Sequence, residues 1–246
     1  SSLECVKKLN KLKVLNLRRR QDNDDAFDIS EIINLPELES LCLSCRKITD
    51  ISYLSELKNL KELTLGTCGI ENVSVLGNLE KLERLDLFAN KKLKNLDVFE
   101  KLKNLKFLEL SFMNSRLDFS KIGYLNSLEE LVITDNSAKI DLSFLQNLTG
   151  LKKLNLDYCK NIADISAFEY ITLLEDLRMN NISKITDHTP IGKLEHLKSI
   201  VMNKATNLED ISFLRNLKEL EYVELFGNRK IKDFSPVEHV KVVKRG

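Results

Sequence analysis

A nine-residue motif, L-x-x-L-x-x-L-x-L, recurs ten times along the 246-residue chain and limits the folds open to it. The first copy is LNKLKVLNL at 9–17 and the last is LKELEYVEL at 217–225, and only Ile, Met or Val replaces Leu. The third apolar position falls at residues 15, 41, 63, 85, 108, 131, 154, 177, 200 and 223. The steps are 26, 22, 22 and then 23 residues, so the 45 leucines predict a repeating scaffold.

The L-x-L at the end of each copy predicts a short strand with one buried face, because its apolar side chains alternate with one that points outward. So short a strand cannot bury that face alone, but a parallel stack of such strands buries a continuous apolar column. Between the strands runs a second pattern, of which ITDISYL (48–54) and IADISAF (162–168) are clear copies. Its Asp or Ser can accept backbone N–H bonds at a short helical or 3₁₀ turn.

The two alternating patterns resemble the leucine-rich repeat family, in the internalin-like and protein-phosphatase-regulator-like subclass with repeats of 22–23 residues. The resemblance implies an α/β repeat solenoid: a curved arc with a parallel β-sheet on its concave face and short 3₁₀ or irregular turns on its convex face. We expect a single domain over residues 1–246 with about ten repeats, in which 238–246 adds a partial capping strand. The charged stretch 18–27 should protrude after the first repeat.

Charge and motif content argue against several classes of function. The 38 basic and 37 acidic side chains give a net charge of +1, which does not favour a nucleic-acid binder. No apolar run is long enough for membrane insertion. The chain carries no glycine-rich phosphate loop, nucleophile elbow or His-Glu-x-x-His stretch, so we expect no enzyme activity and no cofactor.

The cysteines are interpreted as structural thiols. Cys42 and Cys45 have the spacing of zinc ligands, but no histidine lies nearby in the sequence. Cys68 and Cys159 occupy the position, three residues after L-x-L, that holds Asn in other repeats. In leucine-rich repeats a side chain at this position satisfies backbone groups of the turn. We therefore predict no metal site.

One column of charges alternates in sign at every repeat. The residues that follow the second Leu of the motif are Lys13, Glu39, Lys61, Glu83, Lys106, Glu129, Lys152, Glu175, Lys198 and Glu221. Adjacent strands lie about 4.8 Å apart, so each charge has opposite neighbours. We interpret this charge ladder as a device that fixes the stacking register, and not as a ligand site.

A partner is expected on the outward positions of the sheet. Phe88, Phe107 and Phe112 converge on the fourth and fifth repeats at positions predicted to face water, as in an interface hot spot. Alternatively, some of them tuck into the turn and join the core. The candidate partner-binding residues are Asp86, Phe88, Phe107, Glu109, Phe112, Glu130, Asp135, Asp157, Tyr158, Asp176, Arg178, Tyr222 and Phe226.

The acidic residues among these candidates indicate the charge of the partner. Carboxylates gather at the middle of the expected concave face, whereas Arg18, Arg19 and Arg20 make the first repeat basic. An acidic trough with an aromatic floor would attract a protein or peptide with a basic or mixed surface, and would repel nucleic acid.

The leading hypothesis is therefore a monomeric, non-enzymatic module for protein–protein interaction. Two alternatives stay open: the targeting domain of a longer effector or enzyme complex, and the ligand-binding part of a bacterial surface adhesin. The five cysteines show no disulfide-like clustering, which favours a cytoplasmic location. A secreted or cell-surface location is expected instead if a signal peptide has been removed ahead of Ser1.

Overall fold

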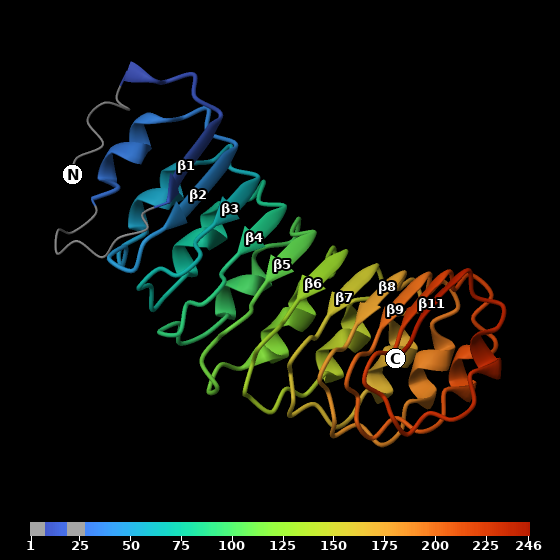
Figure 1. Cartoon of the computed structure of the whole chain (residues 1–246). Coiled ribbons are helices and arrows are strands. Elements are labelled where there is room, and N and C mark those ends of the chain that lie inside the picture. The colour runs from blue at the N-terminus through green and yellow to red at the C-terminus, as the bar shows by residue number, and fades with distance from the viewer. Residues whose placement is uncertain (1–7, 19–27) are drawn as a thin grey trace. The chain divides into compact units, whose positions relative to one another are not determined.

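The computed structural model describes residues 8–18 and 28–246, and the chain forms two compact units, Ser1–Ser127 and Leu128–Gly246. We call them the N-terminal and C-terminal units and describe each by itself (Figure 1). Residues 19–27, most of the stretch expected to protrude, lie outside the described residues. The expectation of one domain over residues 1–246 stays a prediction.

Each unit contains a parallel sheet whose strands follow one another in chain order (Figure 1). The N-terminal unit has β1 (Val14–Arg18), β2 (Ser40–Ser44), β3 (Glu62–Thr64), β4 (Arg84–Asp86) and β5 (Phe107–Glu109). The C-terminal unit has β6 (Glu130–Val132), β7 (Lys153–Asn155), β8 (Asp176–Arg178), β9 (Ser199–Val201), β10 (Tyr222–Glu224) and β11 (Val242–Lys244). β11 pairs with β10 in the segment where a last, covering strand is expected.

Short 3₁₀ helices return the chain from one strand to the next on the other side of each stack. In the N-terminal unit they are η2 (Ser30–Asn34), η3 (Ser52–Glu56), η4 (Ser74–Asn78), η5 (Asp97–Glu100) and η6 (Phe119–Tyr124). In the C-terminal unit they are η7 (Ser143–Asn147), η8 (Ser166–Tyr170), η9 (Thr189–Lys193), η10 (Ser212–Leu214) and η11 (Ser235–Val237). This alternation of short strand and 3₁₀ helix confirms the predicted repeat fold.

The core of each unit lies between the sheet and the 3₁₀ helices. The register places Leu63 opposite Leu41 on one side and Leu85 on the other, and all three are buried. Leu154 and Leu177 are aligned in the same way in the C-terminal unit. Each repeat therefore buries its leucines against the repeats on either side, which is why the stability of such a stack is mostly a nearest-neighbour property.

The turn after each strand has a fixed backbone conformation. The second residue after the L-x-L of β3 to β10 has a positive φ, and we call it the left-handed turn position: Thr67, Ala89, Phe112, Asp135, Tyr158, Asn181, Lys204 and Gly227. Such a conformation costs a non-glycine residue about 1–2 kcal/mol. The N–H groups offset that cost by extending the hydrogen-bond ladder: those of Thr67 and Tyr158 donate to carbonyls of the following repeat at 2.7 and 2.8 Å.

An Asp side chain holds the start of most 3₁₀ helices. Asp164 Oδ1 accepts from the N–H of Ser166 at 2.8 Å, and Asn72 Oδ1 accepts from the N–H of Ser74 at 2.6 Å in the same way. This is an Asx turn, in which the side chain satisfies a donor that the helix leaves open. The contact confirms the predicted role of Asp in the return pattern. Together with a hydroxyl bond from the same Ser, it lowers the pKa of Asp28, Asp50, Asp118, Asp164, Asp210 and Asp233. The pKa of Asp187 is lowered mostly by the hydroxyl of Thr189 and next by its N–H.

These lowered pKa values predict that acid destabilises the protein. A carboxyl with a lower pKa in the folded state stabilises the fold above its unfolded pKa, and that contribution is lost as the pH falls through the folded pKa. We expect the free energy of unfolding, measured in urea, to fall between about pH 5 and about pH 3.

The matched variant for the acid prediction replaces Asp50, Asp164, Asp210 and Asp233 together by Asn. Asn keeps the acceptor, as Asn72 does, but it does not titrate. The variant should be less stable than the parent near neutral pH and should approach it in acid. A stability difference that does not change with pH would contradict the role given to these carboxylates.

Candidate protein-interaction surface

The residues of the charge ladder directly precede the strands in both units. Lys13 and Lys61 both donate to Glu39, each with an Nζ–Oε distance of 2.8 Å, and these bonds lower the pKa of Glu39 to about 2. Further pairs are Lys106–Glu83, Lys152–Glu129, Lys198–Glu175 and Lys241–Glu221. These contacts are those of a structural ladder, and Lys241 extends it to an eleventh repeat.

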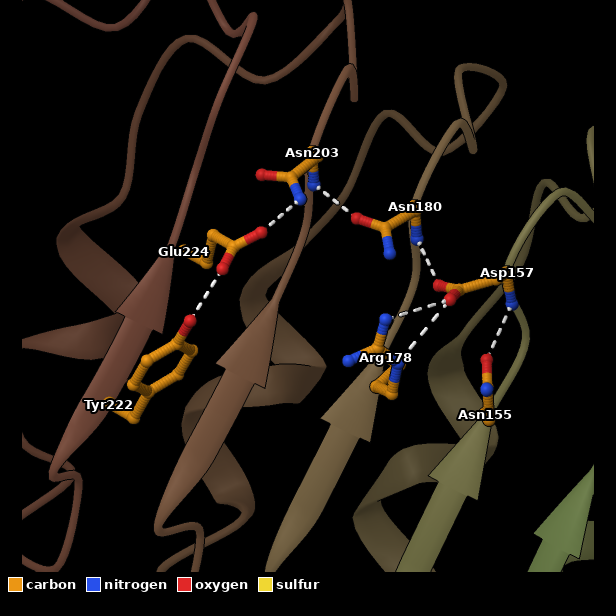
Figure 2. Close-up of polar contacts among 7 residues, drawn as sticks. All are labelled: Asn155, Asp157, Arg178, Asn180, Asn203, Tyr222 and Glu224. Atoms are coloured by element: carbon orange, nitrogen blue, oxygen red, sulfur yellow. Dashed lines mark hydrogen bonds and ion pairs between the residues drawn. The ribbon is translucent and has the colours of Figure 1, made fainter. Parts of the chain in front are cut away.

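We use the term sheet face for the strand side chains that point away from the core. On the sheet face of the C-terminal unit and in the turns that follow β7, β8 and β9, polar groups form one hydrogen-bonded network (Figure 2). Asp157 Oδ1 accepts from the backbone N–H of Asn180 at 2.7 Å, and Asn180 Oδ1 accepts from that of Asn203 at 2.8 Å. Asn203 Oδ1 then accepts from the N–H of Phe226 at 2.7 Å. Each side chain thus fixes the backbone of the next repeat.

The network ends on an aromatic side chain and a carboxylate (Figure 2). Glu224 accepts from Asn203 Nδ2 at 2.6 Å and from the hydroxyl of Tyr222, and these bonds lower the pKa of Glu224. Lys244 Nζ lies 3.9 Å from the same carboxylate and 5.2 Å from the centre of the Tyr222 ring. Glu224 therefore holds the hydroxyl of Tyr222, while Lys244 lies against its ring.

Phe107 does not face water, which corrects the expectation from the sequence. The residue lies on the sheet face of β5, but it is only 8% exposed. The guanidinium of Arg84, its register partner on β4, lies 3.3 Å from the centre of its ring. A cation over an aromatic face is attracted by the ring electrons, so Arg84 covers Phe107.

The acidic trough is also partly neutralised by neighbours. Asp157 is only 7% exposed and receives Arg178 Nε and Nη2 at 3.3 Å each. Glu130 lies 3.8 Å from Lys153 of the next strand. A buried carboxylate requires such donors to offset its lost hydration. The charges of Asp157 and Arg178 therefore mainly neutralise each other.

The other candidates lie on or beside the sheet face. Phe88 and Phe112 are 36% and 37% exposed and meet edge to face, with ring centres 5.3 Å apart. Tyr158 and Phe226 are exposed in the turns of the C-terminal unit, where the ring of Phe226 does not belong to the network. Half-buried carboxylates of the set are Asp86, Glu109, Asp135 and Asp176. The candidates therefore fall into two groups, one in each unit.

Comparison with protein families decides the family of the chain. Residues 26–94 and 124–245 match a model described as the BspA type leucine rich repeat region, in six copies. The chain belongs to this family. The match confirms the leucine-rich repeat fold that the spacing of the leucines predicts. No protein of curated function matches the sequence.

Solved structures resemble this BspA-type chain over most of its length. An internalin of Listeria monocytogenes, InlF, has a TM-score of 0.75 and 27% identity, covering 99% of this chain and 83% of that one. Internalin C2 of the same organism has 0.56 and 24%, covering 87% and 83%. A leucine-rich repeat protein of Leptospira interrogans has a TM-score of 0.71 and 22% identity, covering 89% of this chain and 57% of that one. Because the identities of this protein and of internalin C2 are below 25%, these two likenesses show the fold alone.

Cys68 and Cys159 of this BspA-type chain take the structural role that the sequence predicts, whereas Cys5 lies outside the described residues. Cys159 Sγ donates to the carbonyl of Ile133 at 3.0 Å, and burial raises the pKa of both Cys68 and Cys159 to about 11. Cys42 is half-buried and receives Arg18 Nε at 3.3 Å, whereas Cys45 is buried. Within 8–18 and 28–246, no three His, Cys, Asp or Glu side chains gather as metal ligands. No helix in the same residues has the length and apolarity to cross a membrane.

Some of the polar residues that lie just after the strands are not among the candidates predicted from the sequence. Asn180 and Asn203 carry the network, and they continue the position of Asp157 at a step of 23 residues. A polar side chain repeated at that step would have indicated a hydrogen-bonded column. Arg46, Lys91 and Lys92 surround the exposed phenylalanines of the N-terminal unit, but they lie in turns that an alignment of strand positions leaves out.

Proposed function

We propose that this chain is a non-enzymatic protein-interaction module that binds a protein or peptide on the sheet face of its C-terminal unit. The observation that supports this function best is the network from Asn155 to Tyr222 (Figure 2). Its members come from β7, β8 and β10 and from the turns after β7, β8 and β9, and hydrogen bonds between neighbouring repeats hold Asp157, Arg178, Asn180, Asn203 and Glu224. A surface with fixed side chains loses little conformational entropy on binding, so its contacts contribute fully to affinity.

The composition of this surface suits a partner of mixed charge. Arg178 and Lys153 add cations, Asp176 and Glu224 add anions, and Tyr222 adds an aromatic ring with a polar end. Tyr and Arg are the residue types that most often dominate binding energy at protein interfaces. The rim of charges can orient the partner, while the ring supplies apolar contact area.

We expect Tyr222→Ala to weaken partner binding by about 1 kcal/mol or more, about fivefold in affinity. The intact chain would be used to capture proteins from a cell extract, and the affinity of each purified captured protein would then be measured by calorimetry. The control is Tyr170→Ala, because Tyr170 is an exposed tyrosine of the same unit on the 3₁₀ helix η8.

The two tyrosines separate a sheet-face interface from general adhesion. Binding that falls with Tyr222→Ala and persists with Tyr170→Ala supports the proposed surface. Equal affinity of both variants and the parent protein would show that the partner binds elsewhere. Failure to retain any protein at micromolar concentration would contradict the function itself.

A further inference from the structure

We propose that the N-terminal unit carries a second binding site, a surface pocket that takes an acidic peptide segment through one large apolar side chain. The pocket has a volume of about 420 Å³ and lies at the turns that follow β2 to β5. Phe88 and Phe112 are its two aromatic lining residues, and Arg46, Lys91 and Lys92 line it as well. The proposal rests on the protein-binding function above, but it places a different partner chemistry on a different surface.

The rings of Phe88 and Phe112 form a preformed apolar binding surface. They stay 36% and 37% exposed although they already touch each other, so each keeps area for a third apolar group. The backbone under Phe88 is fixed at both ends: its N–H donates to Asp86 Oδ1 at 2.9 Å and its carbonyl accepts from Thr67 at 2.7 Å. An apolar side chain placed there would be desolvated against rings that do not need to move.

The charges around the two rings favour a partner with negative charge. Three of the nine lining residues are cations and none is a carboxylate. The carboxylate of Glu71, which lies near Lys92, pairs with Lys94 at 2.5 Å. A peptide with Asp or Glu on both sides of its apolar residue would therefore find cations where its carboxylates fall, whereas a basic peptide would be repelled.

The left-handed backbone at Phe112 is not itself a sign of function, because every described repeat after β2 has it. What distinguishes this pair of repeats is two large rings in contact. Tyr158 occupies the same turn position in the C-terminal unit and is 46% exposed, but Asp157 and Asn180 are the polar groups beside it. Tyr158 is therefore a matched control for Phe112, with the same backbone conformation and an aromatic side chain that is also exposed.

The test uses a synthetic peptide, Asp-Glu-Trp-Leu-Glu-Asp, titrated with the full chain. The protein contains no tryptophan, so excitation of indole reports the peptide alone. A second peptide, Lys-Lys-Trp-Leu-Lys-Lys, reverses the charge and keeps the apolar residues. We expect the acidic peptide to bind with a blue shift of its emission, to weaken as salt is added, and to bind better than the basic peptide by about tenfold.

Variants of the protein test whether the acidic peptide binds in this pocket. Phe112→Ala should weaken the acidic peptide about tenfold and Tyr158→Ala should leave it unchanged. Alanine fits this turn position, as Ala89 shows, so the fold should persist in both. Lys91→Glu combined with Lys92→Glu should also weaken the acidic peptide and shift preference toward the basic one.

The outcomes separate this site from the proposed function. No binding of the acidic peptide, equal binding of both peptides, or equal loss in Phe112→Ala and Tyr158→Ala would overturn the pocket. Such a result leaves the sheet-face interface standing if Tyr222→Ala still weakens its own partner. Conversely, peptide binding that depends on Phe112 supports the pocket even if the Tyr222 experiment fails.

Discussion

Leu177→Ala is expected to lower the free energy of unfolding by about 3–5 kcal/mol. Leu177 is fully buried at the centre of β8, where Leu154 and Ile200 are its register partners on β7 and β9. Removing most of the side chain loses buried apolar area and leaves a cavity. The cavity stays open because one repeat, or rung, of the stack cannot collapse without shifting its neighbours. Urea unfolding followed by far-ultraviolet circular dichroism would measure the loss.

A second leucine of the same repeat gives the control for Leu177. Leu173 is four residues earlier in the motif, but it is 47% exposed and does not belong to the apolar columns. Leu173→Ala should change stability by less than about 0.5 kcal/mol. If both variants were equally stable, β8 would not be a buried rung of the stack, and the register on which the network depends would be wrong.

The effect of Leu177→Ala should also spread to neighbouring repeats. Each rung is stabilised mainly by the next, so a weak rung lets its neighbours open as a local unit. Amide hydrogen exchange should therefore increase most in β7, β8 and β9.

The repeat register could be predicted from the sequence because each leucine column is a local signal repeated many times. Sequence periodicity fixes which residues share a rung, and the rungs pair only with their neighbours. β11 has no leucine, yet Lys241 lies 20 residues after Glu221 and keeps the alternation of charge. The charge ladder therefore marks a last rung that the leucine pattern does not reach.

The exposure of side chains on the sheet face could not be predicted in the same way. Strict alternation puts Phe107 outward, and it does lie on the sheet face, but a long side chain from the neighbouring rung covers it. The covering residue, Arg84, is 23 positions earlier and is not marked by any pattern. Asp157 is buried for the same reason by Arg178 and by the backbone of the next repeat. Alternation assigns a face, whereas exposure depends on the pair of residues across two strands.

The second large effect on stability is expected at Asn90, one of the buried asparagines that lie three residues after L-x-L. Its Nδ2 donates to the carbonyls of Leu65 and Leu87 at 2.6 and 2.8 Å, and the side chain is fully buried. Asn90→Ala should lower the free energy of unfolding by about 2–4 kcal/mol, because it leaves the Leu65 carbonyl without this donor and opens a cavity. The same urea experiment measures it.

Asn90→Cys tests whether the loss comes from the missing donor. Cys68 and Cys159 occupy the same position in other repeats, where their thiols donate to carbonyls of the preceding repeat. Asn90 Oδ1 is buried without a hydrogen-bond partner in the described structure, so a thiol would also remove an unsatisfied acceptor. We therefore expect Asn90→Cys to lose less than about 1 kcal/mol. A loss as large as that of Asn90→Ala would mean that the amide acts through its shape, and that Asn and Cys are not equivalent supports of the turn.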